Sequence, residues 1–138
     1  MITLSILKQM QDDNIGTIDN DLFFEEATLD NKGNPKPGVW IVSRGTAVTR
    51  FNTQIQAFDL YVRYTNKLVG IQKAHELLEY LQESFEDVCS LPSYPPYTTK
   101  AYDSVVIVPT SGVESLGSDE QDRMVFVISG EVRYAKTV

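Results

Sequence analysis

The chain has 138 residues, a hydrophobic content of 42% and a net charge of −7. This length and composition predict one globular domain over residues 1–138, which is large enough to bury a core without disulfides or metals. The single cysteine, Cys89, excludes an internal disulfide and a cysteine-rich zinc site, and the acidic balance argues against a nucleic-acid-binding domain. The first residues lack the basic start and long apolar run that are typical of a signal peptide, and no segment has a run of about 18 apolar residues. We therefore expect a soluble protein that stays inside the cell that makes it.

The first third of the chain predicts a short helix and two strands joined by a turn. Residues 3–11 have helical spacing. Their apolar side holds Ile6, Leu7 and Met10. Residues 21–29 and 39–44 are strand-like, and the Gly- and Pro-rich residues 30–38 between them predict a hairpin turn. Residues 45–53 fit either a loop or an extension of the second strand.

The middle of the chain predicts a long strand that leads directly into a long amphipathic helix. In residues 55–64 apolar and polar residues alternate, so the two faces of the strand differ. One face holds Phe58, Leu60, Val62 and Tyr64. The other holds Asp59, Tyr61 and Arg63, and we expect it to be wet or to pair with something polar. Trp40, on the preceding strand, is expected in the core.

From Ile71 the apolar residues recur every three or four positions, which predicts a helix about 28 Å long. Its apolar stripe consists of Ile71, Ala74, Leu77, Leu78, Leu81, Phe85 and Val88. Glutamates form a row on its outer side. We expect this helix and the strand before it to make the core of the domain.

The last third predicts a connector, two strands and a projecting loop. Residues 90–102 contain three prolines and several tyrosines, which either form a sticky surface or cover an edge of their own domain. The apolar run 104–109 fits a central strand that is covered on both faces or buried in an assembly. Residues 110–122 form an acidic loop, and residues 123–135 a last strand with Gly130 as a possible bulge.

The predicted fold class is therefore α+β. We expect one domain with a mainly antiparallel or mixed sheet, on which the long helix and the short N-terminal helix pack, in the order αβββαββ.

The sequence offers no catalytic or metal-binding motif. His75 lies in mid-helix, where Glu79 is more simply an exposed helix neighbour than a catalytic partner. Cys89 follows the helix C-terminus, where we expect a raised pKa and an inert thiol. The acidic clusters lack the spaced oxygen ligands and fixed glycine of a calcium loop, and no nucleotide-binding or protease motif is present. We expect no enzymatic activity, no cofactor and no metal.

Charge is unevenly distributed along the chain. Residues 1–31 carry a net charge of −6, residues 32–67 carry +5, and residues 68–138 carry −6. Either this grouping is chance, or it gives one molecule two complementary surfaces that favour head-to-tail association of copies. In the second case we expect arginines of one copy to face glutamates of the next. The predicted subunit interface consists of Arg44, Arg50, Asp59, Tyr61, Arg63, Glu79 and Glu83.

Two segments carry a resemblance to a known family. They are "QAFDLYVRYTNK", where the strand enters the helix, and the last strand ending in "SGEVRY". Together with the order of elements over essentially the whole chain, they resemble the small tail terminator proteins of long-tailed bacteriophages. These are also described as tail completion, head–tail joining or minor capsid proteins.

This resemblance implies a structural virion protein that forms a ring, usually a hexamer. The ring caps the tail tube and joins it to the head, and DNA passes through the channel without being specifically bound. Its partners are the tail-tube protein and the neck or connector proteins, with no membrane involved. It acts at the tail–head junction of the virion, after assembly in the host cytoplasm.

The resemblance transfers no site residues, so those of the tail or channel contact are chosen by charge. They are Glu114, Asp119, Glu120 and Asp122. Two alternatives stay open. One is another neck component, such as a head-completion or connector protein, and the other is a cellular α+β binding module.

Overall fold

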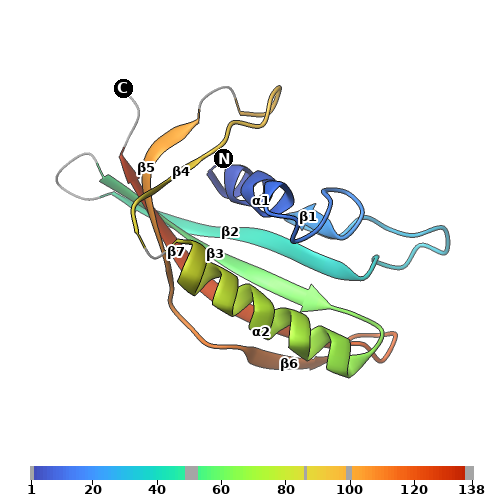
Figure 1. Cartoon of the computed structure of the whole chain (residues 1–138). Coiled ribbons are helices and arrows are strands. Elements are labelled where there is room, and N and C mark those ends of the chain that lie inside the picture. Colours follow the sequence, from blue (N-terminus) through green and yellow to red (C-terminus); the bar gives the residue numbers. More distant parts are fainter. Residues whose placement is uncertain (1, 49–52, 86, 99–100, 136–138) are drawn as a thin grey trace.

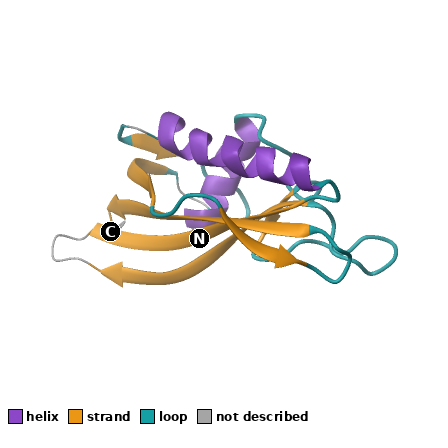
Figure 2. Ribbon diagram, turned by 90° about the horizontal axis from the view of Figure 1, so that it is seen from below, coloured by secondary structure: helices purple, strands orange, loops and turns teal. Residues whose placement is uncertain are grey.

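The computed structural model describes residues 2–48, 53–85, 87–98 and 101–135. It is an α+β structure in which a curled, mixed sheet forms one layer and two helices lie against one of its faces (Figures 1 and 2). The helices are α1 (Ile2–Asp12) and α2 (Lys67–Ser84). The strands are β1 (Leu22–Phe24), β2 (Gly38–Val48), β3 (Thr53–Arg63), β4 (Cys89–Leu91), β5 (Tyr102–Pro109), β6 (Glu114–Ser118) and β7 (Met124–Ala135).

The predicted α+β class is confirmed, whereas the predicted order of elements is incomplete. Two strands are additional: β4 lies in the predicted connector and β6 in the predicted acidic loop. The sheet order is β1-β2-β3-β7-β5-β4, and β6 also pairs with β7. Residues 45–48 extend β2, as one of the two interpretations of this stretch required. Among the described residues no helix is long and apolar enough to cross a membrane.

The predicted hairpin between the first two strands is wrong. Strand β1 has only three residues and runs parallel to β2, with Leu22 opposite Val39. The turn that the Gly- and Pro-rich segment predicts does form, but locally. The Asp30 carboxylate accepts hydrogen bonds from the backbone N–H groups of Lys32 and Asn34. The segment thus closes on itself and leaves β1 free to join the sheet in the parallel direction.

Helix α2 begins earlier than its apolar repeat. Asn66 caps it: the side-chain oxygen accepts hydrogen bonds from the backbone N–H groups of Leu68 and Val69, at 2.9 and 3.3 Å. The buried positions of α2 are Gly70, Ala74, Leu77, Tyr80 and Leu81. The buried side of α2 therefore differs from the predicted stripe. Tyr80 belongs to the core, whereas Val88 lies beyond the helix and is exposed.

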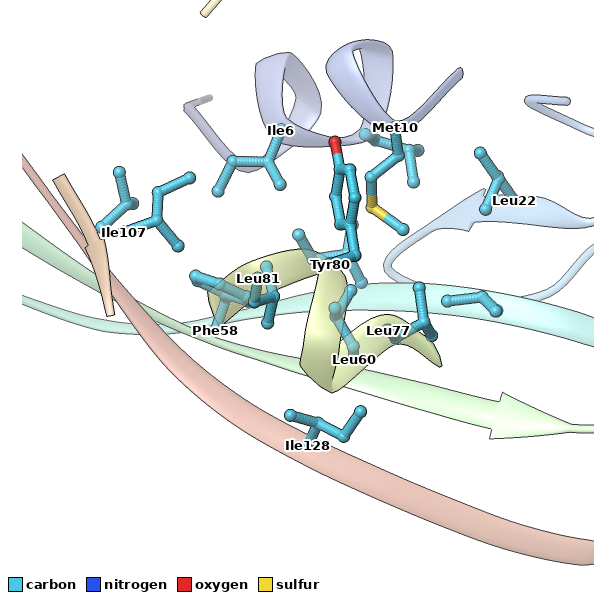
Figure 3. Close-up of a cluster of buried hydrophobic side chains, with 14 of the residues drawn as sticks. Ile6, Met10, Leu22, Phe58, Leu60, Leu77, Tyr80, Leu81, Ile107 and Ile128 are labelled. Carbon is cyan, nitrogen blue, oxygen red and sulfur yellow. The ribbon is translucent and has the colours of Figure 1, made fainter. Parts of the chain in front are cut away.

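The core fills the space between the helices and the sheet. Phe58 and Leu60 of β3 and Ile128 of β7 point toward the helices, as the alternation in β3 predicts (Figure 3). Gly130 is not a bulge, because β7 pairs with β3 through it without a shift in register. A Cβ atom at Gly130 would lie 2.8 Å from the Phe58 ring, so this glycine makes room for the aromatic side chain.

Strand β5 is covered on one face only within the chain. Val105 and Ile107 are buried under the helices, whereas Val106 is half-buried and Val108 is exposed. Of the two interpretations of its apolar run, coverage on both faces is wrong for the single chain. Burial in an assembly stays a prediction.

Candidate functional site: the open face of the sheet

The open face is the side of the sheet opposite α1 and α2, and an aromatic stack covers its centre. Trp40 of β2 and Tyr61 of β3 stack with ring centroids 5.2 Å apart, and the Arg63 guanidinium lies 4.5 Å from the centre of the Trp40 ring. The prediction that Trp40 is a core residue is wrong. Its neighbours Val39 and Ile41 are the buried ones, because adjacent strand residues point to opposite faces.

Beside the stack, Asp59 binds three side chains from three strands. Its carboxylate lies 3.0 Å from Arg44 Nε and accepts hydrogen bonds from Ser129 Oγ at 2.6 Å and from the Tyr61 hydroxyl at 3.4 Å. Burial raises the pKa of Tyr61, and the neighbouring Asp59 carboxylate raises it further. Asp59 is thus buried with its charge compensated inside its own chain.

A second carboxylate, Asp119, organises the turn between β6 and β7. It accepts hydrogen bonds at 2.9 Å from the backbone N–H groups of Gln121 and Arg123, and another at 2.9 Å from Arg123 Nε. Burial alone would raise the pKa of Asp119, but these hydrogen bonds and the Arg123 charge together lower it below its usual value.

Arg63 faces the same carboxylate. Its Nε atom lies 3.7 Å from Asp119 Oδ2 and makes no hydrogen bond within the described part of the chain. Burial, and then the like charge of Arg123, lower the pKa of Arg63. Two guanidinium groups therefore share the Asp119 carboxylate, and the Trp40 ring supplies further attraction for Arg63.

Arg123 also ties two loops into one unit. Its Nη1 atom donates to the Pro35 carbonyl at 2.9 Å, and its Nη2 atom donates to Gln121 Oε1 at 3.0 Å. Gln121 in turn donates to the Asn34 side chain at 3.4 Å. The loop before β2 and the turn before β7 are thus joined at this end of the sheet, although they lie far apart in the sequence.

The structure brings together residues that the sequence assigned to different contacts. Arg63 was predicted at a subunit interface and Asp119 at a tail or channel contact, yet the two lie in one cluster, in which Arg63 is buried and Asp119 is partly buried. Within the single chain Arg63 faces Asp119, and its contact with acids of a neighbouring copy stays a prediction. Arg44 is more accessible than Arg63, with 45% of its side chain exposed against 11%. Arg50 lies outside the described residues.

The other predicted site residues are exposed. Glu79 and Glu83 lie on the outer side of α2, and Glu114, Glu120 and Asp122 lie on β6 and in the turn that follows it. Sequence patterns did not single out Arg123, because the hydrogen bond from its side chain to the Pro35 carbonyl joins positions 88 residues apart. Ser129 was discoverable in principle, since it occupies the open-face position opposite Asp59 in β3.

The helix layer holds a hollow of about 830 Å³ between α1, the end of α2 and β4. The Tyr80 hydroxyl donates to Asp13 at 2.7 Å there, and burial raises the pKa of both Tyr80 and the Cys89 thiol. The expected direction for Cys89 is therefore confirmed, with burial as its cause. His75 is exposed and does not line the hollow. The described residues contain no group of three or more His, Cys, Asp or Glu side chains placed to share a metal ion.

No protein-family model matches the chain, and the comparison with curated proteins also finds no match. Function is therefore inferred from the sequence and from the geometry of the two faces.

Proposed function

We propose that the chain is a structural protein of a long-tailed bacteriophage whose copies associate head-to-tail into a closed ring. The ring caps the tail tube and joins it to the head, and DNA passes through its channel. The protein carries out no catalysis and takes no cofactor. The sequence resemblance supplies the identity of the particle, and the placement of charge supports the mode of assembly.

The single observation that carries the assembly is that the two layers expose opposite charges. The outer side of α2 presents Glu76, Glu79 and Glu83. The open face presents Arg44 and Arg133, whose side chains are about half exposed at 45% and 54%, and each also faces one acid of its own copy, Asp59 and Glu131 respectively. These groups lie on opposite sides of the sheet, so one copy cannot pair them with each other. In a ring, the helix layer of one copy meets the open face of the next.

The buried clusters of the open face make that face suited to such a contact. Asp59 and Asp119 have their charges compensated within the chain. When a neighbouring copy docks and excludes water, these carboxylates therefore still have partners. The Trp40 and Tyr61 rings add flat, rigid apolar surface, as is common at protein interfaces. A neighbouring copy therefore meets a pre-organised face with Arg44 at its accessible side.

The turn after β6 is the proposed contact with the tail tube or the channel. Glu114, Glu120 and Asp122 are exposed there, while Asp119 holds the turn in shape from within. Carboxylates that face a channel repel DNA phosphates and let the genome slide past without sticking.

Electron microscopy of particles assembled without this protein tests the proposal. We expect abnormally long tails or tails that carry no head, because nothing ends the tube or joins it to the capsid. Tails of normal length attached to heads would overturn the proposal. Binding of the purified protein to tail-tube ends but not to capsids separates a tail terminator from another neck component.

A further inference from the structure

A groove lies at the edge of the molecule where α1, β1 and residues 94–97 meet. It consists of two adjoining hollows of about 370 and 270 Å³ that share Phe24 and Asp19. The apolar residues that line it include Leu4, Ile18, Phe24, Leu29, Tyr94 and Tyr97. Large apolar side chains around a hollow of this kind mark an interaction site.

The groove combines an apolar floor with an acidic rim. Leu29 is 60% exposed and Tyr97 is 65% exposed, and the Tyr97 ring stacks on that of Tyr94 at 5.7 Å. Asp19 lines both hollows, and Glu26 lines the larger one. A segment that fits such a groove carries an apolar side chain next to a cation.

The chain itself contains such a segment. Residues 49–52 join β2 to β3 and have the sequence Thr-Arg-Phe-Asn, so Arg50 precedes Phe51. They lie outside the described residues, but β2 and β3 remain paired up to Val48 and Gln54 on either side of them. Arg50 and Phe51 thus place a cation beside an aromatic side chain, and they lie within residues 32–67, which carry a net charge of +5.

The groove and this segment belong to different parts of one copy. Phe24 of β1 lies beside Ile41 of β2, and Val48 is seven residues further along β2, which is about 23 Å. Figure 1 shows β1 and the joined ends of β2 and β3 at opposite sides of the molecule. The arrangement therefore favours a contact between two copies over one within a copy.

We propose that the groove binds the β2–β3 connection of a second copy, with Phe51 against the apolar floor and Arg50 facing Asp19 and Glu26. This inference rests on the proposed head-to-tail assembly and names where one of its contacts is made. Two different surfaces meet in such a contact, as a ring requires. The tyrosines beside the prolines then serve as a binding surface.

Photocrosslinking of the full chain tests the contact. Phe51 is replaced by p-benzoylphenylalanine in isotopically light copies, which are mixed with heavy unmodified copies and irradiated at high concentration. We expect light–heavy crosslinks that mass spectrometry maps to the segments of Leu29 and Tyr97. A second reporter with the crosslinker at Leu116 of β6, which is also exposed, is expected to leave the groove unlabelled.

Matched variants of the heavy partner identify the groove as the acceptor. Tyr97→Lys introduces a charge that repels Arg50, and we expect it to lower the crosslink yield roughly tenfold. Leu116→Lys changes an equally exposed apolar residue away from the groove and is expected to leave the yield unchanged. Both substitutions are at exposed positions, and equal midpoints of urea unfolding confirm that each variant is folded.

Three outcomes overturn the inference: crosslinks confined to single copies, crosslinks to other elements, or no crosslinks at all. If the crosslinker at residue 51 labels no groove residue but the protein still caps tails normally, the proposed contact is rejected and the proposed function stands. If the groove crosslinks form but particles that lack the protein have unaltered tails, the contact between copies stands and the proposed function is overturned.

Discussion

The two faces of one sheet are built on different principles. Toward the helices, β3 presents Phe58, Leu60 and Val62, which are all fully buried among apolar side chains. On the open face the same strand presents Asp59 and Arg63, which are also more than nine-tenths buried, but among charges and aromatic rings. The first face is stabilised by the removal of apolar surface from water. The second face is stable only while each charged side chain has a partner of opposite charge. Substitution of one partner there leaves the other charge buried and uncompensated.

The largest effect on stability is expected on the helix-covered face. Leu77→Ala removes a fully buried side chain, and we expect it to lower the free energy of unfolding by about 2–5 kcal/mol. Leu68→Ala is the matched control in the same helix, because Leu68 is 73% exposed, and it should cost less than about 0.5 kcal/mol. Urea denaturation measures both, and equal midpoints would contradict the packing described for α2.

The next effect is expected in the Asp119 cluster of the open face. Asp119→Asn weakens the hydrogen bonds from two backbone N–H groups and from Arg123, and we expect a loss of about 1.5–3 kcal/mol. Asp122→Asn, in the same turn but exposed, is the matched control and should be close to neutral. Urea denaturation at neutral pH compares the two variants, and equal losses would show that the cluster does not stabilise the fold.

The Asp119 effect is expected to depend on pH. The folded chain lowers the pKa of this group, so its contribution is complete above the unfolded-state value of about 3.9 and disappears as the pH falls through the folded-state value. The difference between wild type and Asp119→Asn should therefore shrink as the pH falls below about 4. Unfolding free energies measured from pH 7 downward check this, and a constant difference would contradict the assigned ionisation.

A smaller effect is expected where the two helices meet. Figure 3 shows the Tyr80 hydroxyl pointing toward α1, where it donates to Asp13. Tyr80→Phe keeps the ring and removes this hydrogen bond, so we expect a loss of about 1 kcal/mol. Tyr97→Phe, at an exposed ring, should leave the unfolding midpoint where it is. A larger effect from Tyr97→Phe would argue against the assigned hydrogen bond.

The smallest effect on stability is expected on the outer side of α2. Glu79→Lys with Glu83→Lys alters exposed residues, so the free energy of unfolding should change by less than about 0.5 kcal/mol. The same variant should weaken association between copies, because it removes the acids that the open face of a neighbour meets. Asp87→Lys is the control, and sedimentation of the two variants side by side separates an effect on assembly from an effect on folding.

Much of the helix-covered face could be predicted from the sequence, because local periodicity determines which side of an element is apolar. The strand around Phe58 and the helix around Leu77 both follow from spacing alone. Parallel pairing of β1 with β2 could not be predicted, since strand direction depends on where a distant segment docks. Periodicity also could not decide that Val39, and not Trp40, faces the helices.

The open face was harder to predict, because its contacts join residues far apart in the chain. The alternation in β3 correctly placed Asp59, Tyr61 and Arg63 on one side. It could not show that Asp119 and Arg123 return from the last turn to the same place. The sequence therefore predicted two separate contacts for Arg63 and Asp119, although these two residues lie in one cluster.

Cryo-electron microscopy of the assembled particle that incorporates this chain tests head-to-tail assembly most directly. The account predicts a closed ring with rotational symmetry, in which the outer glutamates of α2 in each copy face Arg44 on the open face of the next. Copies that meet through identical faces across a two-fold axis, or open faces that remain in contact with solvent all around the ring, would contradict it.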